Sequence, residues 1–316
     1  MKNGTDLGFK VTTGAFGALV LAGVVSIGVV LFRESILSIR EFGLYFWITD
    51  VWDPVAAQFG ARPFIWGTLY SSVLALLIAA PISLGIAIYL SELCPPLLRQ
   101  PLIFLTELLA AIPSIVYGLW GLFVLVPLVR ALETAMPEWL RETALFSGPP
   151  IGLGMLAAAL ILAIMVTPFI SSLAREVLKA VPRTQREGAY ALGATRWEAI
   201  RVALAYGRTG IVGAIMLGFG RALGETMAVT MVIGNNPTVS WSLFAPQYTM
   251  AAVIANEFTE ATDDLHLHAL FEIGLVLFII TLAVNTLSRM LIWSMDRRPA
   301  AKSRVKAEPA LLGDAA

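Results

Sequence analysis

Six long runs of apolar residues set the first limit on how this chain of 316 residues can fold. Each run is of the length, about 20 residues, that a helix needs to cross about 30 Å of hydrocarbon. We therefore predict an all-α, polytopic membrane protein with six transmembrane helices. The predicted spans lie at roughly 14–32, 64–90, 101–129, 150–173, 209–233 and 270–293.

The composition supports a membrane protein and excludes several other classes. Hydrophobic residues make up 58% of the chain and charged residues only 14%, against about 25% charged residues in soluble domains. The net charge is zero, so no overall field recruits nucleic acid. The single cysteine, Cys94, excludes an internal disulfide framework and an all-cysteine metal site. No cleavage signal follows the first run, so we expect that span to remain as an anchor.

Three prolines and one acid lie inside the predicted spans. Pro81, Pro113 and Pro168 interrupt the second, third and fourth spans, and kinks or tilts of bundled helices accommodate them. Glu107 lies in the third span, where we expect it to be buried against neighbouring helices.

The basic residues predict the orientation in the membrane. With the N-terminus inside, the inner segments carry sixteen Lys or Arg and the outer segments five. Such an excess of positive charge is typical of the cytoplasmic side. Both termini and the segment 174–208 should therefore be cytoplasmic.

The last outer connection, 234–269, contains no Lys or Arg but several acids. Its apolar stretch 248–255 is too short to span and predicts a re-entrant or interfacial helix. His266 and His268 lie beside acids in the same connection; we favour a solvated loop there over a metal site. Beyond residue 298 the tail is polar and alanine-rich, and we expect it to be disordered.

The segment 174–208 is unusual because it carries seven Lys or Arg between two apolar spans. Thr184 with Glu187 and Thr195 with Glu198 have the spacing of capping boxes at helix starts. Gly193 stands where the first helix should end in a left-handed turn. The pattern predicts a helix over 185–192, a glycine turn and a helix over 196–205. A mere connection would need only a few polar residues, so we interpret this helical pair as a cytoplasmic docking surface.

The run Glu187-Gly188-Ala189-Tyr-Ala-Leu-Gly193 resembles the "EAA" loop of binding-protein-dependent ABC transporter permeases. Gly188 replaces the first alanine of that motif, and Leu204-Ala205 replaces its closing Leu-Pro. The resemblance implies a type I ABC importer permease in which a coupling helix sits in a groove of a cytoplasmic ATPase. The coupling residues it implies are Glu187, Gly188, Ala189, Gly193, Thr195 and Arg196.

Two charges, Arg221 and Glu225, lie inside the predicted fifth span. A charge at mid-bilayer costs about 2.5–3.5 kcal/mol on insertion scales, so such residues usually face a partner or a wet cavity. Four residues apart on a helix, they would share a face and could pair. Two interpretations stay open: a structural ion pair, or an anion path in which Arg221 binds an oxyanion through its fork of donors. Glycines 218, 220 and 224 would permit close helix packing.

The stretch 220–235, which contains Gly-Arg-Ala-Leu-Gly-Glu-Thr, resembles the matching helix of phosphate-specific (Pst) permeases of the C type. The segment 111–121 of the third span matches the same family. The core Arg-Ala-Leu-Gly-Glu is shared with sulfate and molybdate permeases, so the resemblance implies oxyanion transport first and phosphate second. It implies a substrate pathway through Arg221, Glu225 and Thr226.

The chain contains no Gly-x-x-x-x-Gly-Lys-Ser/Thr loop and no Gly-Lys pair, so ATP would be hydrolysed by a partner. A membrane-embedded enzyme is disfavoured because the catalytic motifs of such enzymes are missing. An ion-coupled secondary carrier would not need the docking loop. The resemblance implies a second homologous permease, two cytoplasmic ATPase subunits, an external phosphate-binding protein and membrane lipid as partners, with no cofactor, metal or nucleic acid.

The resemblance also implies the plasma (inner) membrane of a prokaryote. We divide the chain into a cytoplasmic N-terminal segment (1–13), the first span with its outer loop (14–63), a permease core (64–293) and a cytoplasmic tail (294–316).

Overall fold

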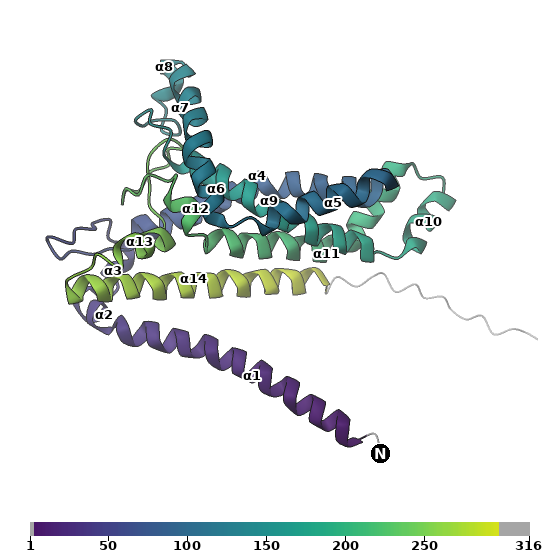
Figure 1. Cartoon of the computed structure of the whole chain (residues 1–316), viewed down its shortest axis with the longest axis horizontal. Coiled ribbons are helices and arrows are strands. Elements are labelled where there is room, and N and C mark those ends of the chain that lie inside the picture. The colour runs from purple at the N-terminus through teal and green to yellow at the C-terminus, as the bar shows by residue number, and fades with distance from the viewer. Residues whose placement is uncertain (1–2, 297–316) are drawn as a thin grey trace, which may run out of the picture.

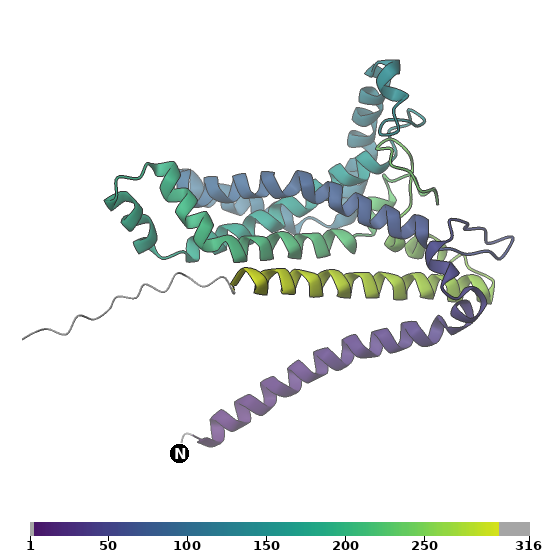
Figure 2. The same ribbon diagram turned by 180° about the vertical axis from the view of Figure 1, so that it is seen from behind.

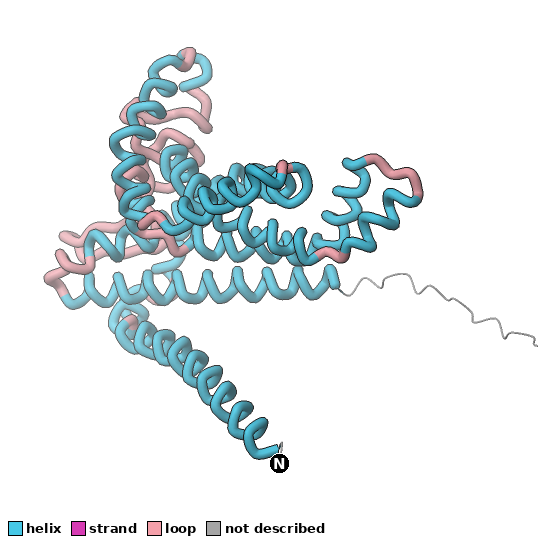
Figure 3. Tube along the Cα trace, turned by 45° about the vertical axis from the view of Figure 1, so that its right-hand side comes forward, coloured by secondary structure: helices cyan, strands magenta, loops and turns pink. Residues whose placement is uncertain are grey.

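A computed structural model of the protein describes residues 3–296, and over this range the chain forms helices joined by loops without a strand (Figures 1 and 3). The predicted all-α fold is confirmed. Helices satisfy the hydrogen bonds of their own backbone, which a segment in hydrocarbon must do. Six helical segments of the described chain are long and apolar enough to cross a membrane. The predicted tail lies almost wholly outside the described residues.

Four long helices run roughly side by side, and α1 joins them at one end and diverges toward its N-terminus (Figures 1 and 2). Pro81 and Pro168 lie inside continuous helices of this set. The five helices are α1 (Asn3–Glu34), α4 (Arg62–Ile88), α9 (Met155–Ala180), α11 (Arg196–Leu223) and α14 (Asp264–Asp296).

Helix α9 is the centre of the bundle. It packs against α4 and α11, and 61% of its apolar window is buried, about twice the share of any other candidate span. Small residues bring the neighbours close: a Cβ added to Gly218 of α11 would lie 2.4 Å from the side chain of Ile170. The predicted packing role of Gly218 is thus confirmed, whereas Gly220 and Gly224 have no atom closer than 3.7 Å at that position.

The third span departs from the prediction of one helix over 101–129. α5 (Pro96–Ala111) ends at Ala111, and the next residue, Ile112, has an extended ψ of 130°. The ring of Pro113 disfavours helical dihedrals at the preceding residue, which explains the break. The chain then continues as α6 (Ser114–Trp120), a π-helical turn η2 (Gly121–Leu125) and α7 (Val126–Ala135). α7 and the short α8 (Glu138–Arg141) rise steeply away from the bundle (Figure 1).

The fifth span also differs from its predicted bounds of 209–233. α11 is a single helix from Arg196 to Leu223, so the predicted helix 196–205 and the span are one continuous rod. The rod ends before Gly224, and a separate short helix, α12 (Met227–Thr230), follows. Residues 224–226 form a helix break where a continuous span was expected.

Helix α10 (Arg183–Ala191) marks one end of the bundle, and a compact aromatic region marks the other. The second region includes α2 (Ile36–Phe42), α3 (Tyr45–Ile48) and α13 (Met250–Glu257). α13 confirms the short helix predicted from 248–255, and Thr68 of α4 accepts a hydrogen bond from the N–H of Met250 at its start. Between α4 and α5, a π-helical turn, η1 (Tyr89–Leu93), lies at the α10 end.

Candidate functional site

A helix, a glycine turn and the start of a second helix form the polar segment between the fourth and fifth spans. α10 is followed by Gly193, whose φ is +82°. The N–H of Gly193 donates to the carbonyl of Tyr190 at 2.9 Å, and that of Ala194 donates to Ala189 at 3.1 Å. A positive φ is inexpensive for glycine and costs other residues about 1–3 kcal/mol. The predicted glycine turn between two helices is confirmed.

The two helix starts differ, although the sequence gives both the same spacing. Thr195 and Glu198 form the predicted capping box, and Glu198 accepts from the N–H of Thr195 at 2.7 Å. The other predicted box is wrong. Pro182 precedes α10 with extended dihedrals and the helix begins at Arg183, so Thr184 lies inside the first turn. Glu187 therefore caps nothing and is exposed.

Arg186 and Arg196 fasten this segment to η1. The guanidinium of Arg186 lies 2.5 Å from Glu92 Oε1 and donates to the carbonyls of Leu178 at 2.8 Å and Val181 at 3.0 Å. Arg196 donates to the backbone carbonyl of Glu92 at 2.6 Å. One residue of η1 thus holds both sides of the glycine turn.

The outward side of the segment displays large apolar side chains. Leu192 is 91% exposed, and Tyr190 and Trp197 are about half exposed. Gly188 has no atom within 4 Å of an added Cβ, so the surface beside Glu187 is open. Exposed aromatic and aliphatic side chains on a charged loop are typical of a protein interaction site.

Arg221 lies in the last turn of α11, exposed, with its guanidinium 5.3 Å from the ring centre of Phe169 on α9. The predicted pairing on one face with Glu225 is wrong. The helix ends at Leu223, and Glu225 Oε1 instead accepts from the N–H of Ala228 at 3.3 Å. None of the ion pairs in the described part of the chain involves Arg221 or Glu225.

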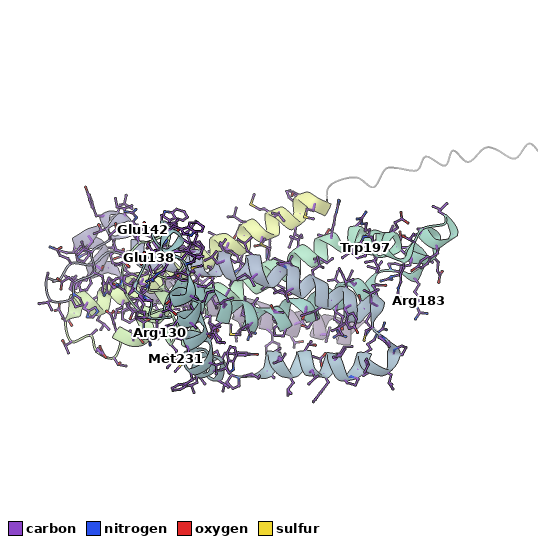
Figure 4. All side chains as sticks on the ribbon, turned by 90° about the horizontal axis from the view of Figure 1, so that it is seen from above. Arg130, Glu138, Glu142, Arg183, Trp197 and Met231 are labelled. Atoms are coloured by element: carbon purple, nitrogen blue, oxygen red, sulfur yellow. The ribbon has the colours of Figure 1, made fainter. Side chains whose placement is uncertain are left out.

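Thr226 lies at the same helix break and directly precedes α12. Its hydroxyl donates to the carbonyl of Gly224 at 3.4 Å. A rise of about 1.5 Å per residue separates Arg196 from Arg221 by about 38 Å along α11. In Figure 4, Arg183 and Trp197 lie at one end of the molecule, and Met231, just beyond α12, lies toward the other.

With this geometry in view, the sequence model of the family described as "Binding-protein-dependent transport system inner membrane component" matches residues 81–300. The matched range includes α9, α11, the α10 segment between them (residues 181–195) and the helix break at residues 224–226. This chain belongs to that family. Its six apolar helices make it a multi-pass member, consistent with an inner-membrane component.

Relatives within the family match over almost their whole length. A protein of Mesorhizobium japonicum named "Phosphate transport system permease protein PstC" is 47% identical over 94% of this chain and 93% of its own. A protein of the same name from Haemophilus influenzae is 48% identical, over 92% and 93%. Among solved structures, an inward-facing form of the MetNI methionine ABC transporter shares the fold, with a TM-score of 0.56 at 16% identity over 73% of this chain and 94% of that one.

The expectation for Glu107 in this permease is also wrong. Glu107 is not a buried acid: it lies on α5 with a side chain 57% exposed, 3.3 Å from Arg175. The break at Pro113 places α5 apart from the third candidate span, which begins at Ser114, so the apolar run misled the assignment.

The histidines do not lie in a solvated loop. His266 is buried at the start of α14, 3.1 Å from Glu257, and stacks on Phe59. His268 Nδ1 hydrogen-bonds the backbone carbonyl of Glu34. No group of three or more His, Cys, Asp or Glu within 3–296 could hold a metal ion.

Sequence reasoning missed Glu92 and Phe169. Glu92 is 94 positions from Arg186, so no local spacing connects the two residues. Phe169 contacts Arg221 across two helices, and a phenylalanine in an apolar span has no distinctive sequence signal. Both contacts come from the packing of α9 and η1 against the segment that contains the motifs.

Proposed function

We propose that this chain is the channel-forming permease subunit of an ATP-driven importer of inorganic phosphate, and that it couples ATP hydrolysis by a partner ATPase to alternating access. The observation that carries the proposal is the continuity of α11. One helix joins the α10 docking segment to Arg221, an arginine without an acidic partner among the described ion pairs. The relatives named phosphate permeases, matched over more than 90% of this chain, supply the substrate.

The α10 segment has the properties that ATPase coupling requires. It is anchored through Arg186 and Arg196, so a force applied to it is transmitted to η1 and α11. Its exposed residues, from Glu187 to Trp197, offer apolar contact area beside charge. We assign Glu187, Gly188, Ala189, Gly193, Thr195 and Arg196 to the contact with the ATPase.

Arg221 has the properties that an oxyanion contact requires. Arginine keeps its charge at all physiological pH values and presents a rigid fork of donors that matches tetrahedral oxyanions. Because Glu225 turns toward α12, the guanidinium is free to bind an anion without first breaking an ion pair. The phenyl face of Phe169 holds the charge in place by a cation–π contact. We assign Arg221, Glu225 and Thr226 to the substrate pathway.

The assembly that follows contains this chain, a second homologous permease, two cytoplasmic ATPase subunits and an external phosphate-binding protein. Both termini and α10 face the cytoplasm, because the inner segments carry sixteen basic residues against five outside. Single cysteines near Arg196 and beyond Lys302 should then react only with reagents that enter the cell, and one near Asp263 should react from outside. External labelling near Arg196 in intact cells would contradict this orientation.

The proposal is tested by reconstituting the whole complex in proteoliposomes with ATP inside and the binding protein and radiolabelled phosphate outside. We expect uptake that requires internal ATP and that excess sulfate or molybdate does not reduce. A complex with a hydrolysis-deficient ATPase is the matched control. Stronger competition by sulfate or molybdate would assign another oxyanion, and uptake driven by an ion gradient without ATP would indicate a secondary carrier.

A further inference from the structure

A cleft of about 790 Å³ opens at the α10 end of the molecule, between η1, α5, α9 and α10. It lies apart from Arg221, which is not among its lining residues. Five basic side chains from three helices line it: Arg99, Arg175, Lys179, Arg183 and Arg186. Cations this close together repel one another unless anionic groups neutralise them.

The acids in the cleft neutralise only part of this charge. Ion pairs with glutamates occupy Arg175 and Arg186. The other three cations have no carboxylate at ion-pair distance within residues 3–296. Among the acids of the lining, only Glu187 lacks an ion pair in the same range. Arg99, Lys179 and Arg183 are therefore unpaired in the described chain, and the five cations of the lining exceed its four acids by one positive charge.

Arg99 gives a second, independent indication of a missing acceptor. One of its terminal nitrogens donates to the carbonyl of Ser91 at 3.0 Å, which fixes the guanidinium at the wall of the cleft. Its Nε is buried and has no hydrogen-bond partner in the described part of the chain. A buried donor without a partner is costly, and an anion with several oxygens would satisfy it once the guanidinium turns toward the cleft.

The cleft is also in line with Arg221 along α9. Phe169, which contacts Arg221, lies about 15 Å from Lys179 along the helix axis at about 1.5 Å per residue. Ser172 and Glu176 follow Phe169 at spacings of three and seven residues, so they share its face. Glu176 itself lines the cleft. One face of α9, which carries Ser172 and Glu176 beside Leu173, thus leads from Arg221 toward the basic cavity.

We propose that this cleft is a second anion site of the protein, which binds a phosphate group through Arg99, Lys179 and Arg183. The group is either inorganic phosphate leaving the pathway or the phosphate monoester of a lipid headgroup, since both offer the same charged oxygens. The assignment of the cleft to the cytoplasmic mouth rests on the proposed function. The binding chemistry does not, because it depends only on the residues of the cleft.

Lysine footprinting of the assembled complex in nanodiscs tests the site directly. Lys179 and Lys10 are acetylated with a water-soluble reagent, with and without inorganic phosphate at constant ionic strength, and quantified by mass spectrometry. At phosphate ten times its dissociation constant, we expect acetylation of Lys179 to slow about tenfold, since about nine sites in ten are then occupied. Lys10, on α1, should be unaffected. Equal slowing at both lysines would overturn the proposal, and so would an unprotected Lys179 with both inorganic phosphate and the phosphatidic acid lipid described below.

Two variants separate a built site from general screening. Arg99→Gln combined with Arg183→Gln should remove the protection of Lys179 while the complex stays assembled on a sizing column. Arg208→Gln is the matched control, because Arg208 is an exposed basic residue of α11 outside the cleft. Protection that survives the double substitution, or that is lost equally in the control, would contradict the assignment.

The source of the phosphate group is distinguished by lipid composition. In discs of phosphatidylcholine alone, protection should require added phosphate if the ligand is inorganic. In discs that contain phosphatidic acid, protection without added phosphate would assign the site to the lipid headgroup.

A direct binding measurement tests the site without chemical modification of lysine. Equilibrium dialysis of radiolabelled phosphate against the Arg221→Ala complex should show a saturable residual site. Adding Arg99→Gln and Arg183→Gln should remove it. No residual binding would exclude inorganic phosphate as the ligand, and residual binding unchanged by these substitutions would overturn the second site. Uptake by the wild-type complex tests the proposed function separately.

Discussion

Two arginine-bearing regions of this permease have opposite environments. At the α10 end, Arg186 has a carboxylate and two backbone carbonyls as acceptors, and its side chain is mostly buried. At the end of α11, Arg221 is exposed, and its guanidinium lies over the ring of Phe169 in a cation–π contact. An arginine with its donors satisfied fixes the geometry of the backbone around it. An arginine with its donors free can bind something that the chain itself does not contain.

The largest effect should come from removing the free arginine. If Arg221 contacts the anion, Arg221→Ala should lower phosphate uptake about 10- to 100-fold, because hydrogen bonds to a charged group contribute about 1.5–3 kcal/mol. Lys should restore little, since a point charge does not reproduce the bidentate fork. Uptake in proteoliposomes, with assembly checked on a sizing column, measures the effect.

Substitution of Glu225 tests whether Arg221 acts as a free arginine or as one member of a structural ion pair. Because it does not pair with Arg221, the double variant Arg221→Ala, Glu225→Ala should show no recovery of uptake. Recovery would show that the two residues form a structural pair in the membrane and would end the anion-path assignment.

The second prediction concerns the glycine turn at the α10 end, where Arg186 has its acceptors. Gly193→Val places a β-branched residue at a φ of +82° and should cost about 1–3 kcal/mol in strain. The Cβ itself meets no atom within 4 Å, so the effect is one of dihedral angle and not of crowding. We expect uptake and binding-protein-stimulated ATP hydrolysis to fail together, as reciprocal coupling requires.

Gly193→Asn is the control for this turn, because asparagine tolerates the left-handed region. It should retain most of both activities. Wild-type uptake by an assembled Gly193→Val complex would mean that the α10 segment is an ordinary connection.

A third, smaller effect should follow from weakening the anchor. Glu92→Gln leaves Arg186 without its carboxylate in a mostly buried position, and we expect a loss of roughly 2 kcal/mol in stability. Thermal unfolding and the amount of ATPase that co-purifies both report it. Asp50→Asn is the matched control, since the Arg62–Asp50 pair is about half exposed and should contribute about 0–1 kcal/mol. Equal losses in the two variants would remove the distinction between anchor and surface pair.

The smallest effect tests the two threonines that share a sequence pattern. Thr195→Ala removes the cap of α11 and should destabilise the protein by about 1 kcal/mol. Thr184→Ala should change stability by a few tenths of a kcal/mol at most, because Thr184 caps no helix and is exposed. Parallel unfolding curves of the two variants provide the measurement.

The sequence predicted what local chemistry determines. Gly193, the capping of Thr195 and the short helix near 250 follow from residues within a few positions of one another, and each was found. The apolar runs predicted the number of candidate spans because hydrophobic length is also a local property.

Two of the failures share a cause: the pattern was extended through a break. Arg221 and Glu225 share a face only if helix continues across Gly224, and Glu107 is buried only if helix continues across Pro113. Contacts between distant segments, such as His266 with Glu257 and Phe59 or Glu92 with Arg186, follow from packing, on which the spacing of residues carries no information.

The close packing of α11 on α9 has a mechanical consequence. Near the midpoint between Arg196 and Arg221, a Cβ at Gly210 would lie 2.7 Å from Val177 and one at Gly207 would lie 3.2 Å from it. At Gly218, one turn before Arg221, the approach to α9 is closer still, at 2.4 Å. The rod is therefore held against α9 from its middle to its Arg221 end. A pull on the glycine turn would move the α10 end of the rod about a pivot near Gly218, and the backbone that carries Arg221 would stay against α9.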